Sequence, residues 1–306
     1  QATQDGLPTF DTNVVFEMLS PATDVELFVT GRRIILLPQV YESPCQEVLG
    51  WLTDIAEALS GKEQRIGLRE YPRQIFTVTY RLDGNDRQRM QAALLDWQDN
   101  IFGFPVWHER LFATATISSG ATSISVADAD EVDIRVGGLV AIIASNSSFE
   151  VSEVASVSPT SIGLVTATGA AYASGTAVVP LRLAVIRDTV NSSRYKNTLE
   201  DFTITFEVTD NDTGALTGST TPGFWSIYNS RVLFDDPNVV EGETVDQQYS
   251  RRVYRIDNQT GIISQVSLWD RGKRVHPKGF FLRNRAEIIQ FRRLLTSLRG
   301  RQVAFY

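Results

Sequence analysis

Cysteine and histidine are scarce in this 306-residue sequence, which contains one cysteine, Cys45, and two histidines, His108 and His276. A single cysteine cannot form an internal disulfide, and it fits synthesis in a reducing cytoplasm with a packed or idle thiol. One cysteine and two distant histidines exclude the usual structural zinc sets. Either histidine is more simply explained as a surface or packed side chain than as a catalytic base.

Long apolar runs are also missing. No run approaches the roughly 20 residues that a bilayer-spanning helix needs. No charged-then-apolar signal opens the sequence either, so we expect a soluble protein. The apolar fraction is nevertheless 42%, with 16 Phe and five Trp, which predicts a folded chain. Its length is enough for two or three domains with buried cores.

The common catalytic motifs are absent too. The sequence has no Gly-x-Ser-x-Gly elbow, no phosphate-binding Gly-x-x-x-x-Gly-Lys-Ser/Thr and no His-Glu-x-x-His. Asp128, Asp130 and Asp133 resemble the start of a calcium loop, but the required later glycine and glutamate are missing, so a solvated turn is expected. We therefore predict no catalytic residue, no cofactor and no metal site.

Glycoside hydrolysis needs two carboxylates that flank a sugar cleft. Acidic residues that fall in predicted loops or turns provide candidates: Asp235, Asp236, Glu241, Glu243, Glu200 and Asp201. Nothing in the sequence selects one pair among them. A polysaccharide hydrolase is therefore a minor alternative, and the main prediction is that the chain is not an enzyme.

Charge is unevenly distributed along the chain. The net charge is −7. Residues 251–306 carry 13 Lys/Arg against three Asp/Glu, a net +10, whereas the first 250 residues carry 16 against 33, a net −17. Such polarity suits head-to-tail or ring contacts between copies of a chain. A solvated basic helix face explains it equally well.

Two segments of equal length share one order of elements. Asn85–Trp107 and Asn284–Tyr306 both read as an amphipathic helix that runs into a short aromatic strand. The predicted apolar helix positions are Met90, Ala93/Leu94, Trp97 and Ile101 in the first, and Ile288, Phe291, Leu294/Leu295 and Leu298 in the second. The two helices need a one-residue shift for these faces to coincide. The pattern indicates a duplicated strand–strand–helix–strand module.

The strands of both modules follow from alternating patterns. Asp24–Val29 and Arg33–Leu37 are predicted as two strands around Thr30-Gly31, and 47–59 as a helix ended by Ser60-Gly61. Gln64–Arg69 and Gln74–Arg81, divided at Pro72, are predicted as an antiparallel pair. In the second module, Gly261–Trp269 is the predicted strand before the helix.

Composition changes between the modules. Residues 113–180 are rich in Ser, Thr, Ala, Gly and Val, and short β-like segments alternate with Gly/Ser turns, which indicates a small barrel or sandwich. Those segments are Ala121–Val126, Leu139–Ala144, Phe149–Val157, Ser161–Val165 and Thr176–Leu183. Phe202–Val208 then returns as a strand of the first module.

These patterns predict an α+β fold that is mainly β, with an inserted small all-β domain. The expected boundaries are 1–112 plus 181–211 for the first module, 113–180 for the insert, 212–250 for a linker and long loop, and 251–306 for the second module. The basic C-terminal region also contains Phe280, Phe281 and Phe291. These aromatics lie in phase with the buried face and the rest of the chain is acidic, so direct nucleic-acid binding is not expected.

Several stretches resemble tail-tip proteins of tailed bacteriophages. They are Arg65–Arg73 (RIGLREYPR), Phe76–Tyr80 (FTVTY) with the helix and Phe104–Trp107 (FPVW), Phe149–Val154 with Tyr172–Thr176, and Tyr254–Tyr306. The resemblance covers about three quarters of the chain. Its motifs are patterns of strand and helix with aromatic endings.

The resemblance implies a distal-tail or baseplate structural protein of the virion, built here from two split-barrel-like modules. It implies a homo-oligomeric ring, sixfold or threefold, around the tail tube, assembled in the bacterial cytoplasm and joined to hub or fibre proteins. Two modules depart from the single-copy family form, so ring stoichiometry stays open. The family has no catalytic residues to carry over, and it implies that the insert projects outward to hold fibres or touch host glycans.

Four arginines of the second helix are the predicted contacts with an acidic neighbour in the assembly: Arg285, Arg292, Arg293 and Arg299. Reversing Arg292 and Arg293 to Glu is expected to leave the monomer folded and to disrupt assembly. The alternative function is a receptor- or carbohydrate-binding adaptor that acts through 113–180. Sugar platforms usually need exposed aromatic faces, and Phe149 and Tyr172 are the only large aromatics there after Phe112.

Overall fold

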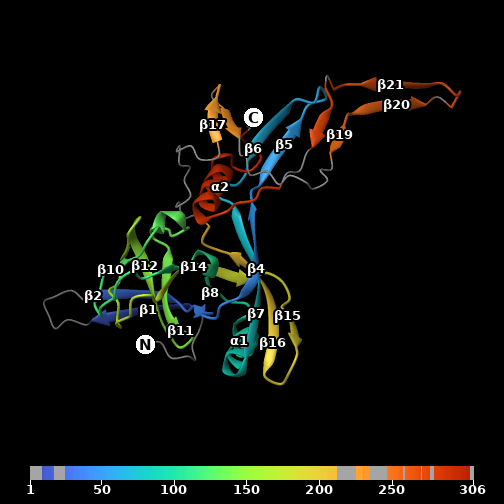
Figure 1. The fold of residues 1–306 in the computed structure, drawn as a ribbon. Helices are drawn as coiled ribbons and strands as arrows, with labels where there is room; N and C mark the ends of the chain where they lie inside the picture. Colours follow the sequence, from blue (N-terminus) through green and yellow to red (C-terminus); the bar gives the residue numbers. More distant parts are fainter. Residues whose placement is uncertain are drawn as a thin grey trace. The chain divides into compact units, whose positions relative to one another are not determined.

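The computed structural model describes residues 9–16, 25–211, 225–229, 231–234, 247–257, 259–269, 271–275 and 279–303. Strands make up 47% and helices 14%, which confirms the mainly β, α+β fold. The chain divides into two compact units, whose helices and strands are labelled in Figure 1. Unit 1 contains residues 1–48, 73–130 and 134–213, and unit 2 contains 49–72, 131–133 and 214–306.

Unit 1 is built on a large antiparallel sheet. Its strands are ordered β10 (Ser123–Ser125), β13 (Ser161–Leu164), β12 (Ser148–Ser158), β11 (Leu139–Ser145), β14 (Ala177–Ile186), β16 (Leu199–Val208), β7 (Arg73–Asp83) and β4 (Glu42–Gly50). Alternate residues of β7, from Phe76 to Leu82, are buried. Because successive strand residues face opposite sides, this alternation gives β7 one core face. The predicted strands at 74–81, 139–144, 149–157, 161–165 and 202–208 are confirmed.

One strand, β14, joins the predicted insert to the rest of the sheet. Its residues Ala177–Leu181 pair with β11, and its residues Ala184–Ile186 pair with β16. β14 also pairs with β8 (Phe102–Pro105) and β9 (Leu111–Phe112), which precede the insert. Ile143 of β11 belongs to the same buried cluster as Phe76 and Phe206. Residues 113–180 therefore share a sheet and a core with the segments on either side.

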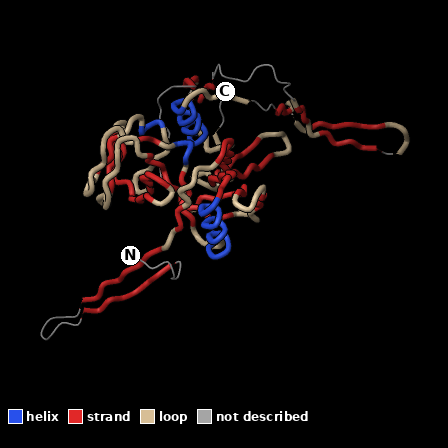
Figure 2. The backbone as a smooth tube through the Cα atoms, turned by 60° about the horizontal axis from the view of Figure 1, so that its bottom comes forward, coloured by secondary structure: helices blue, strands red, loops and turns tan. Residues whose placement is uncertain are grey.

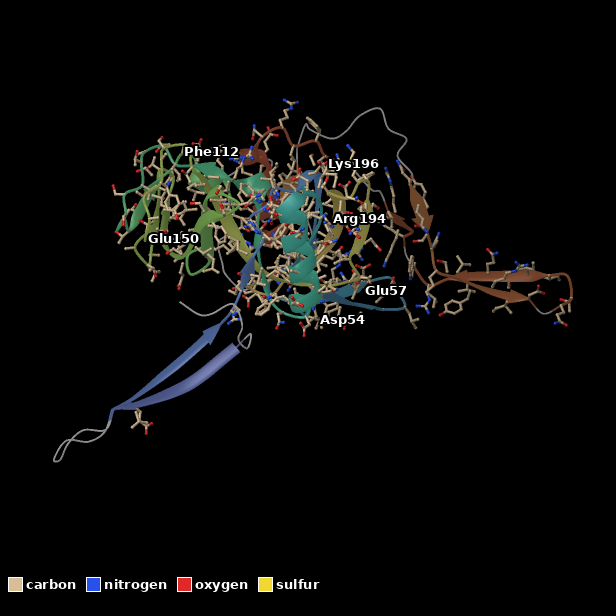
Figure 3. The ribbon with its side chains drawn as sticks, turned by 90° about the horizontal axis from the view of Figure 1, so that it is seen from below. Asp54, Glu57, Phe112, Glu150, Arg194 and Lys196 are labelled. Carbon is tan, nitrogen blue, oxygen red and sulfur yellow. The ribbon has the colours of Figure 1, made fainter. Side chains whose placement is uncertain are left out.

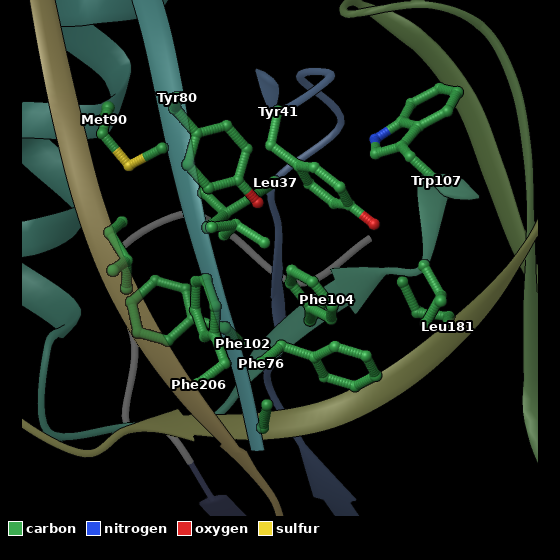
Figure 4. Packing of buried hydrophobic residues seen from close by; sticks show 14 of the residues in the cluster. Leu37, Tyr41, Phe76, Tyr80, Met90, Phe102, Phe104, Trp107, Leu181 and Phe206 are labelled. Atoms are coloured by element: carbon green, nitrogen blue, oxygen red, sulfur yellow. The ribbon is translucent and has the colours of Figure 1, made fainter. Parts of the chain in front are cut away.

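Aromatic side chains fill that core (Figure 4). The Phe104 ring lies 4.9 Å from both Phe76 and Phe206, and it stacks on Tyr41 at 5.7 Å. Aromatic residues bury large apolar areas, and such offset or tilted pairs add about 0.5–1.5 kcal/mol each beyond burial. Helix α1 (Gly84–Trp97) adds Met90, Ala93 and Trp97, so the predicted first helix and its apolar face are confirmed at these positions.

Shorter elements complete unit 1. Strands β1 (Thr9–Phe16) and β2 (Val25–Arg32) form a hairpin, β3 (Ile35–Leu36) pairs in parallel with β8, and β15 (Asn191–Arg194) pairs with β16. Two 3-10 turns, η1 (Trp107–Glu109) and η2 (Ala129–Glu131), follow β8 and β10. In the insert, Glu150 accepts hydrogen bonds from the Gly169 amide at 2.7 Å and the Tyr172 hydroxyl at 3.2 Å (Figure 3).

The described residues of unit 2 form two-stranded pieces and one helix (Figure 2, strands red and helices blue). The pairs are β5 (Thr53–Glu57) with β6 (Glu63–Gly67), β17 (Trp225–Tyr228) with β18 (Arg231–Phe234), β19 (Gln248–Ser250) with β22 (Lys273–Val275), and β20 (Val253–Asp257) with β21 (Ile263–Ser267). The helix is α2 (Arg285–Ser297). The strands of the described residues form open sheets in both units and no closed barrel.

The predicted helix over 47–59 is wrong. These residues lie in β4 and β5, and the β5–β6 hairpin turns at Gly61, whose φ is +82°. Two backbone hydrogen bonds close the turn of this hairpin. The Ala58 amide donates to the Lys62 carbonyl and the Gly61 amide donates to the Ala58 carbonyl, both at 2.9 Å. Strand pairing of Ile55 with Arg65 overrides the helix-like spacing of Trp51 and Ile55.

Two strand predictions also need correction. Thr30-Gly31 lies inside β2 instead of between two strands, because β2 pairs with β1 over eight residues, from Val25 to Arg32. The strand at 64–69 does not pair with the strand at 74–81. β6 pairs with β5, whereas β7 pairs with β16. Correspondingly, residues 49–72 group with 214–306 rather than with the first module.

Candidate assembly surface

Helix α2 has strong stop and start signals. The Asn284 side chain accepts a hydrogen bond from the Glu287 amide at 2.8 Å, and the Glu287 carboxylate accepts one from the Arg283 amide at 2.6 Å. The first bond satisfies an amide that the first helical turn leaves unpaired, and the second fixes the residue that precedes the cap. At the other end, Arg299 and Gly300 both have positive φ, which ends the helix as left-handed caps commonly do. The predicted second helix is therefore confirmed.

The apolar face of α2 packs into a small cluster. Leu294 and Leu298 are buried, with Leu282 and Phe291 packed against them. The Phe280 and Phe291 rings lie 5.7 Å apart, which agrees with the core role expected for Phe291. One position differs from the prediction, because Ile289 is buried whereas Ile288 is exposed. A helix advances about 100° per residue, so the apolar stripe begins one residue later than predicted.

The four predicted contact arginines do not share one environment. Arg285 and Arg299 are exposed, and Arg293 is half-buried. Arg292 is only 6% exposed, so its place on an outer contact face is wrong. It lies three residues after the buried Ile289, and residues three apart share a helix face. Reversing its charge would therefore disturb the packing of α2, contrary to the expectation of an unaffected monomer.

The segment after α2 packs against the start of the β5–β6 hairpin. The Arg65 guanidinium donates to the Arg301 carbonyl at 2.9 Å. A Cβ atom on Gly300 would lie 2.8 Å from Cβ of Trp51, closer than real Cβ contacts. Glycine is thus needed there for close approach as well as for its φ of +66°. Of the predicted aromatic strand after the helix, Val303–Tyr306, Val303 is described and lies in a bend, and 304–306 lie outside the described residues.

Lys273 of β22 forms ion pairs with both strands of the β5–β6 hairpin. Lys273 Nζ lies 2.7 Å from Glu57 Oε1 and 2.5 Å from Glu63 Oε1, and it sits 4.8 Å from the Trp269 ring centre. Glu57 projects from β5 (Figure 3). The hydrogen bond from Lys273, the largest cause, and the hydrogen bond from Arg65 hold the pKa of Glu63 below its usual value. The hydrogen bond to Glu57 contributes most to raising the pKa of Lys273, and the hydrogen bond to Glu63 contributes next.

The β20–β21 hairpin has two unlike faces. Residues opposite each other in the register share a face, and alternate residues along a strand change face. Tyr254 pairs with Val266 and Ile256 with Ser264, which makes one face apolar. Leu268 and Ile262 continue this alternation at either end. All five apolar side chains are exposed, from 38% for Leu268 to 74% for Ile262.

The opposite face of the hairpin is more polar and internally paired, although Val253 and Ile263, each 45% exposed, also lie on it. Arg255 and Asp257 form an ion pair at 4.0 Å, and the Arg251 guanidinium donates to Ser267 Oγ at 2.8 Å. Arg252 belongs to the apolar face, where its guanidinium lies 5.5 Å from the Tyr254 ring centre. The apolar face was not predicted as a site, although the alternation of Tyr254 with Ile256 and of Val266 with Leu268 was a usable signal.

The carboxylates considered for catalysis have structural partners where they are described. Glu200, 4% exposed, accepts hydrogen bonds from Arg194 at 3.1 Å and from Gln91 at 2.9 Å. Burial raises its pKa, but bonds from Ser192 and Arg194 outweigh this effect and lower it overall. Asp201 pairs with Arg81 through two 3.0 Å bonds on the opposite face of β16. Asp235, Asp236, Glu241 and Glu243 lie outside the described residues.

The remaining candidate residues are dispersed. His108 Nδ1 forms a 2.8 Å hydrogen bond with the Tyr41 hydroxyl, whereas His276 lies outside the described residues. Asp130 lies in η2 and Asp128 has a φ of +55°. Within the described ranges, no group of three or more His, Cys, Asp or Glu side chains is placed to hold a metal ion. None of the helices described there has the length and apolar character needed to cross a membrane.

Unit 1 also has an open polar depression of about 580 Å³. The start of α1 and the β11–β12 turn line it together, through Asp83, Asn85, Asp86, Arg89, Ser145, Asn146 and Ser147. The side-chain amide of Asn146 donates to the Asp86 carboxylate at 2.8 Å across it.

No protein-family profile matches this sequence. A search of curated proteins finds no match either.

Proposed function

We propose that this chain is a structural component of a bacteriophage tail tip. In this proposal it forms a distal-tail or baseplate ring of three or six copies around the tail tube and links the tube to hub or fibre proteins. In this proposal, the regions that contain α1 and α2 act as the two strand–strand–helix–strand, split-barrel-like modules predicted from the sequence. The chain assembles in the bacterial cytoplasm and resides in the virion, and we assign it no catalytic step and no cofactor.

The observation that carries the proposal is how little of unit 2 is buried. Every residue of β19, β20 and β21 is exposed. The buried apolar side chains described in this unit are Val132, Trp269, Ile289, Leu294 and Leu298. A two-stranded hairpin with both faces in water is marginally stable at best. A unit built from such hairpins is better suited to completing its packing against other subunits than to standing alone.

Charge supports association between unlike surfaces. Residues 251–306 carry a net +10 and the first 250 residues a net −17. Complementary potentials orient partners and fix their register. Contacts between two different patches of one chain are heterologous, and they generate rings when the rotation closes. The sequence resemblance to tail-tip proteins points to the same kind of assembly.

The location of the chain in particles tests this proposal. Phage particles produced by cells that encode the chain would be labelled with gold-conjugated antibody against it and imaged by electron microscopy. We expect label at the end of the tail distal to the head. Particles that contain no trace of the chain by labelling and by mass spectrometry would contradict the proposal.

A receptor- or carbohydrate-binding adaptor is the second candidate. The polar depression favours it, because carboxylate, amide and hydroxyl groups converge there from α1 and the insert. Such groups can hydrogen-bond a sugar. The aromatic residues of the insert support it less, since Tyr172 is buried and its hydroxyl is bound to Glu150. Phe149 is partly exposed but is not among the lining residues.

Substitution in the depression separates the two candidates. Asn146→Ala removes an amide that lines it, and Asn100→Ala, at an amide bonded outside it, provides a control. The adaptor function predicts particles that assemble normally but adsorb poorly to cells only with Asn146→Ala. Normal adsorption by both variants would leave the structural role as the better-supported function.

A further inference from the structure

We propose that the apolar face of the β20–β21 hairpin docks on the C-terminal end of α1 in a second copy of this chain. The apolar face is defined by Tyr254, Ile256, Ile262, Val266 and Leu268. The inference rests on the assembly role proposed above and names the contact that would build it. Three features carry it, namely the two faces of the hairpin, the outer face of α1 and the charges on both.

The hairpin is amphipathic, yet its apolar face is uncovered. Within the described part of the chain, β20 and β21 pair only with each other. Ile262 is 74% and Ile256 50% exposed. Apolar surface in contact with water favours burial in a partner, and a contiguous exposed apolar patch commonly marks an interaction site. The opposite face has an ion pair and a hydrogen bond and two exposed apolar side chains, Val253 and Ile263, so the larger uncovered apolar area is on the face of Tyr254 and Ile256.

The outer face of α1 offers a matching patch. Leu95 is 85% exposed, the largest value among the described apolar side chains, although α1 buries Met90 and Trp97 on its other face. Ala92 lies three residues before Leu95 and shares its face, whereas Asp96, four residues after Ala92, lies at the edge of that face; both are exposed. Asp99, just beyond the helix, is exposed too. The result is an apolar centre with an acidic rim.

The acids on this patch lie at the unfavourable end of their helix. The C-terminal end of a helix carries partial negative charge and is stabilised by cations. The last turn of α1 has no basic residue, and Asp96 lies in that turn. A local arrangement that costs stability is often retained for function. A cationic partner at this end of α1 would offset the unfavourable charge.

The hairpin supplies that cation. Residues 251–267 contain Arg251, Arg252 and Arg255 against Asp257, a net +2. Arg252 lies beside Tyr254 on the apolar face itself. Face-to-face pairing of two hairpins would bring their positive charges together. Docking of the hairpin on α1 instead brings its arginines near the acidic residues at the end of that helix. Docking on a second copy is therefore favoured over a symmetric hairpin dimer.

A pair of variants on opposite faces of one hairpin tests the apolar contact. Ile256→Asp places a charge on the apolar face, and Gln265→Asp places the same charge on the polar face. Both positions are exposed, so both proteins should keep the circular dichroism spectrum of the wild type. By sedimentation over a range of concentrations, we expect Ile256→Asp to weaken self-association at least tenfold and Gln265→Asp to change it less than about threefold.

A charge swap tests the identity of the docking surface. Arg252→Asp and Asp96→Arg should each weaken association about tenfold, and the double variant should recover most of it. Recovery would assign the contact to these two surfaces, as in double-mutant cycles of close charge pairs. Failure of the double variant to recover would overturn α1 as the docking surface.

The outcomes separate this contact from the assembly role. Undiminished association of Ile256→Asp, in a wild-type protein that associates, overturns the hairpin contact and leaves the assembly role standing. Wild-type protein that stays monomeric at every concentration overturns the proposed docking between copies. Particle labelling then decides independently whether the chain is a virion component.

Discussion

Lys273 Nζ lies 2.7 Å from Glu57 Oε1, although 216 positions separate the two residues in the sequence. The contact joins β22, in the basic C-terminal region, to a hairpin near the beginning of the chain. Glu63 completes it from the neighbouring strand β6. Unit 2 is thus assembled from two distant segments, and charged side chains make part of the connection.

This connection should depend on pH in a defined direction. Because hydrogen bonds from Lys273 and Arg65 lower the pKa of Glu63, its contribution to stability is present above the usual pKa of 4.5 and is lost as pH falls through the lowered value. Because the pKa of Lys273 is raised, its contribution to stability is fully present below pH 10.5, its usual pKa. That contribution is lost as pH rises through the raised pKa. The contact should therefore be intact between these limits.

The variant Lys273→Met tests the cause of that shift. It keeps the length and apolar stem of the side chain and removes its charge, so the pKa of Glu63 should rise toward 4.5. Arg65→Met, which removes the second contributor, should raise it less. An NMR titration of the Glu63 carboxyl measures both. A Glu63 pKa that is equal in wild type and Lys273→Met would refute the contact.

Arg292 and Arg285 should respond differently to charge reversal. Arg292→Glu places an opposite charge in the buried face of α2, and breaking buried charge interactions typically costs about 3–5 kcal/mol. Arg285→Glu changes an exposed residue in the first helical turn, where a carboxylate is tolerated, and should change stability by about 0.5 kcal/mol or less. Urea denaturation followed by circular dichroism compares them. Equal stability of the two variants would contradict the burial of Arg292.

The insert should unfold together with the rest of unit 1. Ile143 of β11 belongs to the core cluster that contains Phe76 and Phe206. Ile143→Ala should therefore lower the free energy of unfolding of unit 1 by about 2–5 kcal/mol, and Val165→Ala, at an exposed position of the insert, should lower it far less. Hydrogen exchange measures both regions at once. Loss of protection confined to residues 113–180 would show that the insert is an independent domain.

Local patterns in the sequence predicted the elements that local physics controls. The alternation in 202–208 identified β16, and the spacing of Met90, Ala93 and Trp97 identified α1 and its buried face. The spacing of Phe291, Leu294 and Leu298 identified α2. These signals depend on neighbours within a few residues, so they can be seen without the fold.

Partner choice between strands was harder to predict. Nothing local indicates that β6 pairs with β5 instead of β7, or that 49–72 groups with 214–306, because these pairings depend on distant segments such as the one containing Lys273. The same limit applies to the candidate surface. Helical spacing alone could place Arg292 outward with Arg285, but burial depends on what packs against each face, and the structure buries Arg292.

The central claim is that copies of this chain associate into a closed assembly. Native mass spectrometry of the purified full chain, over a range of concentrations, measures this most directly. Our account predicts a species of three or six times the 34.1 kDa chain mass, whose population rises with concentration. A chain that remains at the mass of one copy at every concentration would contradict it.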